Sequence, residues 1–373
     1  MLTFLGVVFL VYGAMHLYAF GKLWLAFPHS PAFGAALVCL GIVMVSAPFI
    51  AGYLERHHWH GANVAVSWVS YVWMGYLFLF CVVFLMFDLG HVLVPLLGFK
   101  WRIGNAAVLG SVAFIAVVLF GYGMVEARQI RVAQLTIHTP KLSAAVGRVS
   151  IAQISDLHLG ITQGDAFLKR VVARLCSLQP DIVVATGDIV DGHGDDYSRL
   201  AKRFNECRPP KGEFAVTGNH EYYAGLENSL RFLHKAGFTV LRGEAVAAGG
   251  VVFVGVDDPA GLARGQEARL NMHAAIPQGA FVILLKHQPV VDQDIPFDLQ
   301  LSGHIHGGQI APFNFVTRLV YGVNTGLTRL AAGRWLYVSR GTGTWGPPIR
   351  LFAPPEITLI SIEHGKQQTA ALD

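Results

Sequence analysis

The chain has 373 residues, of which 53% are hydrophobic and only 14% are charged, against about a quarter in an ordinary soluble domain. This composition excludes a disordered chain and a collagen-like repeat, and four cysteines are too few for a disulfide-rich secreted scaffold. Only six of the 52 Asp, Glu, Lys and Arg residues precede Glu126. We therefore expect a membrane-embedded first third followed by a water-soluble domain. The net charge of +4, without a basic stripe, disfavours a nucleic-acid partner.

Four apolar runs in residues 1–125 are each long enough to cross the ~30 Å hydrocarbon core of a bilayer. They are Leu2–Phe20, Ala32–Leu54, Val64–Phe87 and Ala106–Met124. The sequence thus predicts a four-helix transmembrane anchor, a multi-pass location in the cell (inner) membrane and the lipid bilayer as a partner. Four spans would place both ends on one side, and a one-residue excess of basic residues favours a cytoplasmic soluble domain. The residues counted are Arg56, Arg128, Arg131 and Lys141 on the domain side, and Lys22, Lys100 and Arg102 opposite.

The anchor contains two polar features, one acidic residue at the edge of a span and one histidine-rich loop. No acidic residue is expected inside a span except Asp88 at an edge, so an ion pathway lacks the buried carboxylate that it would need. The loop with His57, His58 and His60 permits either a metal site or an ordinary interfacial loop.

Residues 126–148 are modestly basic and are interpreted as a linker, and residues 149–373 as an α/β domain. Short β-branched runs alternate there with segments of helical spacing, which is typical of helices layered on sheets. The expected strands are Val149–Ser155, Asp181–Thr186, Glu213–Thr217, Val251–Val256, Phe281–Leu285 and Leu299–Ser302, and the expected helices are Asp165–Leu178, Ser198–Glu206 and Leu226–Ala236.

Polar side chains follow five of these strands directly. They occur in Asp156-Leu-His158, Gly187-Asp188, Gly218-Asn219-His220-Glu221, Lys286-His287 and Gly303-His304-Ile-His306. Ligands of α/β sheets gather outside the carboxyl ends of the strands, so we expect these groups to converge. A set of carboxylates, an amide and imidazoles without thiolates suits Mn, Fe, Zn or Ni, and it is large enough for two ions.

The ordered series Asp-x-His, Gly-Asp-x-x-Asp, Gly-Asn-His-Glu, His and Gly-His-x-His resembles the signature of the calcineurin-like metallophosphoesterases over roughly residues 149–373. Gly307-Gly308-Gln309 and the tail from Ser339 to Arg350 look like the bacterial membrane-anchored branch, although Ile305 stands where that branch commonly has Thr. The resemblance implies a four-layer α/β/β/α sandwich and two divalent metal ions, with manganese favoured over iron, zinc or nickel.

The resemblance also implies a role for each site residue. Asp156, His158 and His306 would hold the first metal, and Asn219, His287 and His304 the second. Asp188 would bridge the two ions, His220 would be the acid at the leaving group, and Asp191 would brace its loop. Arg340 and Arg350 flank a Gly/Pro-rich loop, where they would either bind a substrate phosphate or serve the loop structurally.

The implied activity is hydrolysis of a phosphodiester, phosphomonoester or pyrophosphate by attack of metal-bound hydroxide, with His220 protonating the leaving oxygen. The anchor favours a lipid-borne substrate. One member of the branch cleaves UDP-2,3-diacylglucosamine in lipid A synthesis, which makes that pyrophosphatase activity the specific alternative. A non-catalytic metal-binding sensor module is less favoured, because every ligand and the acid are present.

Overall fold

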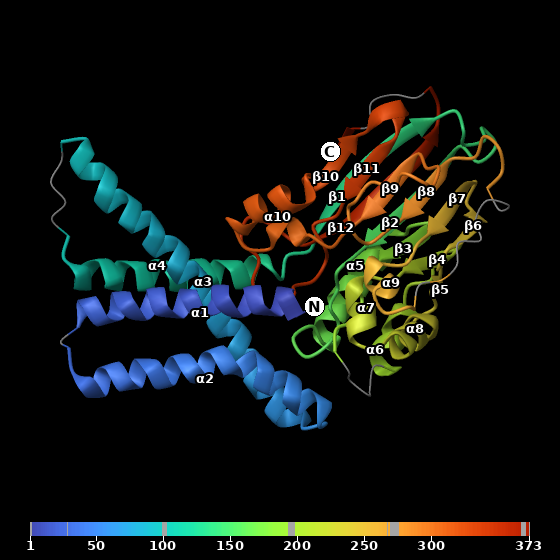
Figure 1. Cartoon of the computed structure of the whole chain (residues 1–373). Coiled ribbons are helices and arrows are strands. Elements are labelled where there is room, and N and C mark those ends of the chain that lie inside the picture. Colours follow the sequence, from blue (N-terminus) through green and yellow to red (C-terminus); the bar gives the residue numbers. More distant parts are fainter. Residues whose placement is uncertain are drawn as a thin grey trace. The chain divides into compact units, whose positions relative to one another are not determined.

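The protein is described here from a computed structural model (Figure 1) that covers all residues except 1, 28, 99–102, 193–197, 267, 269–275, 367–370 and 373. The described chain divides into two compact units, residues 1–125 with 346–349 and residues 126–345 with 350–373. Lys100 and Arg102, two of the basic residues counted for membrane sidedness, lie outside the described residues.

The first unit contains four helices, α1 (Leu2–Ala26), α2 (Pro31–Arg56), α3 (His60–Leu96) and α4 (Asn105–Glu126). Among the described residues three of them, α2, α3 and α4, are long and apolar enough to cross a membrane. The expected four spans are therefore corrected to three. Helix α1 occupies the place of the first expected span, but most side chains of its first two turns lie outside the description. With three spans instead of four, the number of crossings no longer implies that both ends of the anchor lie on the same side of the membrane.

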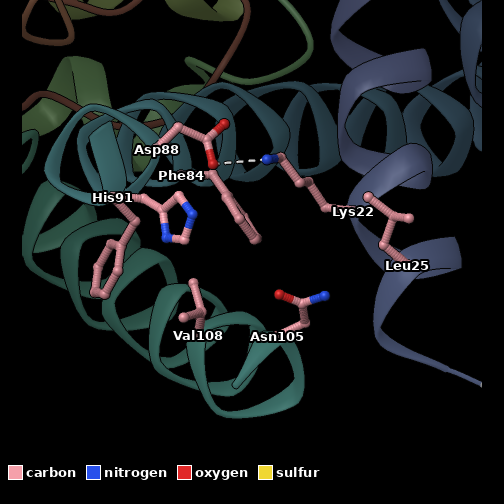
Figure 2. Close-up of a pocket in the computed structure, with 8 residues that line it drawn as sticks. Lys22, Leu25, Phe84, Asp88, His91, Asn105 and Val108 are labelled. Atoms are coloured by element: carbon pink, nitrogen blue, oxygen red, sulfur yellow. Dashed lines mark hydrogen bonds and ion pairs between the residues drawn. The ribbon is translucent and has the colours of Figure 1, made fainter. Parts of the chain in front are cut away.

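Asp88 lies within α3 and is paired with another ionisable side chain. Lys22 Nζ donates to Asp88 Oδ1 at 2.6 Å, and the Tyr18 hydroxyl donates to Asp88 Oδ2 at 2.6 Å. Figure 2 shows Lys22 and Asp88 with His91 and Asn105 around a cavity of about 170 Å³. The ion pair explains how a carboxylate is tolerated among apolar helices, because charges inside membranes are paired.

The second unit is built on two mixed sheets, with strand orders β13-β1-β12-β2-β3-β4-β5 and β10-β11-β9-β8-β7-β6 (Figure 1). The first sheet contains β1 (Arg131–Thr139), β2 (Arg148–Ile154), β3 (Ile182–Thr186), β4 (Glu213–Val216), β5 (Thr239–Val240), β12 (Glu356–His364) and β13 (Ala371–Leu372). The second contains β6 (Glu244–Ala248), β7 (Val251–Gly255), β8 (Val282–Leu285), β9 (Leu299–Ser302), β10 (Gly326–Arg329) and β11 (Trp335–Val338).

Two apolar cores hold these layers together. Helices α5 (Asp165–Leu178), α6 (Ser198–Phe204) and α8 (Leu226–Lys235) bury their apolar faces on one side of the first sheet. The other side of that sheet packs on the second sheet, where Ile151, Phe214 and Phe253 are fully or almost fully buried. Shorter helices, α7 (Asn219–Tyr223), α9 (Pro259–Leu262), α10 (Phe313–Tyr321), η1 (His306–Gly308) and η2 (Ala331–Gly333), lie in the connections.

The segment 126–148, expected to be a linker, contains β1 and belongs to the domain. All nine residues of β1 pair in parallel with β12, from Arg131 opposite Glu356 to Thr139 opposite His364. Leu135 and Ile137 are buried between the two sheets. The linker interpretation was wrong. It rested on the basic residues of the segment, whereas Leu135 and Ile137 alternate with polar residues as in a half-buried strand, and the partner strand lies at the far end of the chain.

Candidate metal centre

The polar residues that follow the strands are brought to common edges by the topology. Strands β2, β3 and β4 are parallel neighbours, as are β8 and β9, so their carboxyl ends point the same way in each sheet. The segments that begin at Asp156, Gly187, Gly218, Lys286 and Gly303 leave from these ends. The expected convergence follows from this arrangement.

The described residues contain three groups whose ligand atoms lie within 4.8 Å of one another. They are Asp156, His158 and His306; His158, Asp191 and His220; and Asp188, His287 and His304. Six of the seven metal ligands expected from the sequence fall in these groups. The His57, His58 and His60 loop does not enter any such group within the described residues.

Asp188 lies between two pairs of imidazoles. His158 Nε2 is 3.0 Å from His306 Nε2, and His287 Nε2 is 3.1 Å from His304 Nδ1. Asp188 Oδ2 is 3.1 Å from His287 Nε2 and 3.9 Å from His158 Nε2. Ring nitrogens that converge this closely suit a common cation, and a carboxylate within reach of both pairs is placed as a bridging ligand would be.

Asn219, the seventh expected ligand, supplies the clearest sign that the residues fit a metal. Its side chain is buried, and its Oδ1 has no hydrogen-bond partner in the described part of the chain. Buried acceptors without a partner are rare in folded proteins. An amide oxygen held at this position is a suitable ligand for a hard divalent cation.

The backbone at the site is strained. Five of the seven expected ligands have positive φ angles; they are Asp156 (54°), His158 (49°), Asp188 (53°), His304 (73°) and His306 (50°). Such conformations cost of order 1–3 kcal/mol each and collect at functional sites. Gly218 and Gly303 permit the crowding, since a Cβ on either would collide with the carboxylate of Asp188 or of Asp156.

Burial and charge set the protonation states of the ligands. Burial lowers the pKa of His304 to about 3, helped by the neighbouring His287, and burial with the Arg350 cation holds the pKa of His306 well below its usual value. Burial works against the charge of Asp188, but His287 holds the pKa of this carboxyl well below its usual range. Neutral imidazoles and an ionised carboxylate are the forms that bind metals, and His304, His306 and Asp188 are held in them. His287 differs, because burial lowers its pKa but Asp188 outweighs burial and raises this pKa well above its usual value, so a metal would have to displace its proton.

His220 lies beside the candidate centre, with its ring oriented by a carboxylate. Its Nδ1 lies 2.9 Å from Asp191 Oδ1, which fixes the ring and leaves Nε2 as the nitrogen free to meet a substrate. Burial lowers the pKa of His220, but the carboxylates of Asp188 and Asp191 outweigh it and raise this pKa to about 9. The imidazole is therefore protonated near neutral pH, as an acid must be before it donates.

Glu221 received no role from the sequence, although it stands in the Gly-Asn-His-Glu motif. Its fully buried carboxylate accepts backbone N–H bonds from Gly218 at 2.7 Å, Asp188 at 2.9 Å, Ile189 at 2.7 Å and Val190 at 3.1 Å. It thereby holds the loops after β3 and β4 together. Only its place directly after His220 could have signalled this role.

Arg350, expected as a possible phosphate ligand, is instead a structural residue. It is fully buried, and its guanidinium donates to the carbonyls of Gly343, His306, Arg340 and Ala353. Arg350 Nη2 also lies 3.2 Å from His306 Nδ1, so it positions a candidate ligand from behind. The substrate-contact interpretation of Arg350 is therefore corrected.

Two further residues, Arg340 and Tyr321, lie next to the candidate ligands. Arg340 is half-buried, pairs through Nε with Glu356 Oε2 at 3.0 Å and lines a cavity of about 280 Å³, so a phosphate contact stays a proposal for it. The Tyr321 hydroxyl lies 2.6 Å from His304 Nε2. The sequence analysis missed Tyr321, because it belongs to α10, for which no helix was expected.

Comparison with known proteins agrees with this geometry. A family model described as calcineurin-like phosphoesterase matches residues 149–308. An uncharacterized metallophosphoesterase of Aquifex aeolicus is 43% identical over 260 residues, which are 67% of this chain and 98% of that protein. One of Campylobacter jejuni is 29% identical over 381 residues, covering 98% of this chain and 99% of its own. The UDP-2,3-diacylglucosamine pyrophosphatase LpxG of Chlamydia muridarum is 30% identical over 302 residues, covering 63% of this chain and 90% of its own.

Proposed function

Since this chain belongs to the calcineurin-like metallophosphoesterase family and is a metal-dependent phosphohydrolase with membrane helices, we propose that it hydrolyses a lipid-borne phosphoester or pyrophosphate at a two-metal centre. The observation that carries the proposal is the convergence of Asp, Asn and His side chains after five strands, with Asn219 Oδ1 buried and unpaired among the described residues. The proposal includes a four-layer α/β/β/α arrangement of the domain.

The contacts support one assignment of the ligands. Asp156, His158 and His306 would hold one ion, Asn219, His287 and His304 the other, and Asp188 would lie between them. The absence of thiolates from these groups favours manganese, with iron, zinc or nickel as alternatives. Two divalent ions bound here would supply Lewis-acid activation of water and neutralise charge on the phosphoryl oxygens.

The chain's own residues would handle the proton and the geometry. His220, whose Nδ1 is held by Asp191, would donate from Nε2 to the departing oxygen, a contribution of about 10²–10⁴-fold in rate. Glu221 fixes the loops that carry Asp188 and Asn219, so both reach the centre without rearrangement. Arg340 would contact a substrate phosphate.

A specific substrate is supported by one relative. The Chlamydia LpxG protein, named as a UDP-2,3-diacylglucosamine pyrophosphatase, shares 30% identity with 63% of this chain. A diacylated sugar nucleotide is a substrate that an enzyme with three membrane spans would meet at the bilayer surface. We include this pyrophosphatase activity as the specific form of the proposal, with the domain on the cytoplasmic side.

The test uses purified full-length protein reconstituted in lipid nanodiscs with Mn²⁺. Hydrolysis of a chromogenic phosphodiester, a phosphomonoester and UDP-2,3-diacylglucosamine is measured side by side, together with bound metal by elemental analysis. We expect about two ions per chain and a rate preference of orders of magnitude for the lipid pyrophosphate. Comparable slow turnover of all three would refute the specific substrate and leave the phosphoesterase chemistry intact.

A matched pair of variants tests the metal assignment. Asp188→Asn should lose metal and activity together, because the residue would contact both ions. Asp294→Asn makes the same substitution at an exposed carboxylate of the same domain and should change neither. Full activity in Asp188→Asn would refute the two-metal centre.

A further inference from the structure

Helix α10 presents its apolar side chains to the outside of the domain. None of its nine residues is buried. Phe313, Phe315, Val316, Leu319 and Val320 are between 45% and 86% exposed. Monomeric soluble domains rarely expose contiguous apolar surface of this kind, and where they do it marks an interaction site. We call these five side chains the α10 apolar face.

The polar side chains of α10 lie on the side of the cavity instead, although Asn314 and Arg318 stay exposed there. Asn314, Thr317 and Arg318 line the cavity of about 280 Å³, together with Phe315 from the edge of the apolar face, and the Tyr321 hydroxyl lies 2.6 Å from His304 Nε2. At about 100° per residue these four positions fall within one sector of roughly 100°, and the apolar residues occupy the remainder. A surface helix of a soluble domain has the opposite orientation, with its apolar stripe on the core. The polarity of α10 is inverted.

The cavity beneath α10 adjoins the metal centre. Ile305 and Gly307, which flank His306, form part of its wall, and Arg318 and Arg340 both contribute to its lining. Two guanidinium groups in one cavity suit a phosphate, which arginine binds through paired hydrogen bonds. Phe352, at 72% exposed, lines the same cavity and adds a further exposed aromatic side chain.

We propose that the α10 apolar face lies in the surface of the bilayer, and that the cavity beneath it binds the phosphate of an anionic lipid headgroup next to the metal centre. The inference deepens the proposed function and rests on it for the lipid as substrate. A bilayer is the occupant because the chain carries three helices suited to span one, which makes the membrane its permanent neighbour. The arginines complement the negative charge of its headgroups, whereas the apolar side chains suit its acyl region.

The position of α10 is tested by fluorescence quenching in nanodiscs that contain brominated phospholipids. Leu319→Trp places a reporter on the α10 apolar face, and Leu262→Trp places one at another exposed leucine of the same domain, on α9. The signal of each variant is taken relative to the wild type, which has seven tryptophans. We expect strong quenching at position 319 and little at 262. Equal quenching at both positions overturns the proposal, and so does shielding of position 319 that rises with protein density, because a second copy would then cover the face.

Kinetics test the link to catalysis. The rate on an anionic lipid substrate in vesicles is compared with the rate on a soluble chromogenic phosphodiester. Leu319→Glu should lower the ratio of these rates at least about tenfold, because a carboxylate is excluded from the acyl region. Leu262→Glu should leave the ratio unchanged. A parallel loss of both rates in Leu319→Glu would show a structural role for α10 and overturn the proposal.

The cavity is tested separately through Arg318. Arg318→Gln should raise KM for the anionic lipid about fivefold, whereas Arg231→Gln, at an exposed arginine on α8, should not. Equal KM values for the two variants would refute a headgroup site in the cavity. If the protein hydrolyses no phosphoester, the proposed function fails, but the quenching experiment still decides where α10 lies.

Discussion

Glu221 connects two strand-end loops through a single buried carboxylate. Oε1 accepts N–H bonds from Ile189 and Val190, and Oε2 accepts them from Asp188 and Gly218. Burial raises the pKa of Glu221, whereas these donors favour the ionised form. In Glu221→Gln one of the two oxygens becomes an NH₂ group, so two backbone donors lose their acceptor and face another donor.

The cost of this substitution can be worked out from those contacts. A hydrogen bond to a charged group contributes about 1.5–3 kcal/mol, so losing two costs about 3–6 kcal/mol of the free energy of unfolding. For a domain of this size each kcal/mol lowers Tm by about 2–4 °C. We expect Glu221→Gln to unfold roughly 6–24 °C below the wild type, and to bind less metal because Asp188 is no longer held.

The assay is thermal unfolding of the full chain in detergent, followed by intrinsic fluorescence, with metal content measured on the same samples. Glu227→Gln is the matched control, because the Glu227 side chain is 92% exposed and meets only the surface residue Arg231 among the described contacts. A Tm for Glu221→Gln within about 2 °C of the control would refute the argument that this carboxylate holds the loops.

Three further predictions concern the acid, a buried carboxyl and the metals. His220→Ala should keep its metal and lose about 10²–10⁴-fold in kcat, measured on a chromogenic ester with a poor leaving group; loss of metal would instead make His220 a ligand. Burial raises the pKa of Glu213 from 4.5 to about 7, outweighing the opposing Arg208, so the folded state binds the extra proton. The protonated Glu213 therefore stabilises the folded state fully below about pH 4.5, and this stabilisation is lost as pH rises through about 7. It amounts to on the order of 1–2 kcal/mol, because the group is only partly buried. Glu213→Gln should flatten the fall in Tm between pH 5 and 8, and an unchanged slope would exclude this group. Chelation should lower Tm by several degrees in the wild type and not in Asp188→Asn, since ligands at about 100 times Kd contribute about 2.7 kcal/mol; equal shifts would place the stabilising ions elsewhere.

The sequence was sufficient to predict those elements in which a local hydrophobic pattern is followed directly by the site residues. Six expected strands correspond to β2, β3, β4, β7, β8 and β9, and three expected helices to α5, α6 and α8, each within a few residues. Buried parallel strands have continuous apolar runs, and the site residues follow them directly, so a local signal located both. The convergence of Asp156, Asp188 and His306 followed from the direction of the strands.

The sequence was insufficient where the decisive partner is distant. β1 is a strand because β12, at the other end of the domain, pairs with it. Arg350 is neighboured in sequence by a Gly/Pro-rich loop, which suggested either a phosphate contact or a structural role, and the folded chain buries it behind His306. Helix α10 was not predicted, although Phe315, Val316 and Leu319 have helical spacing, and the sequence does not show that this apolar stripe is exposed in the folded domain.

The metal centre combines several features that each reduce the stability of the protein without a cation. Five of the proposed ligand residues have left-handed backbone conformations, each at a cost of about 1–3 kcal/mol. The carboxylates of Asp156 and Asp188 are buried, and their mutual repulsion contributes to a raised pKa of Asp156, for which burial is the larger cause. Native domains are stable by only about 5–15 kcal/mol, so such costs persist only where binding offsets them. Apolar side chains would fill a purely structural role here at a smaller cost in folding free energy. We therefore interpret the cluster as a site for cations and the chemistry that they support.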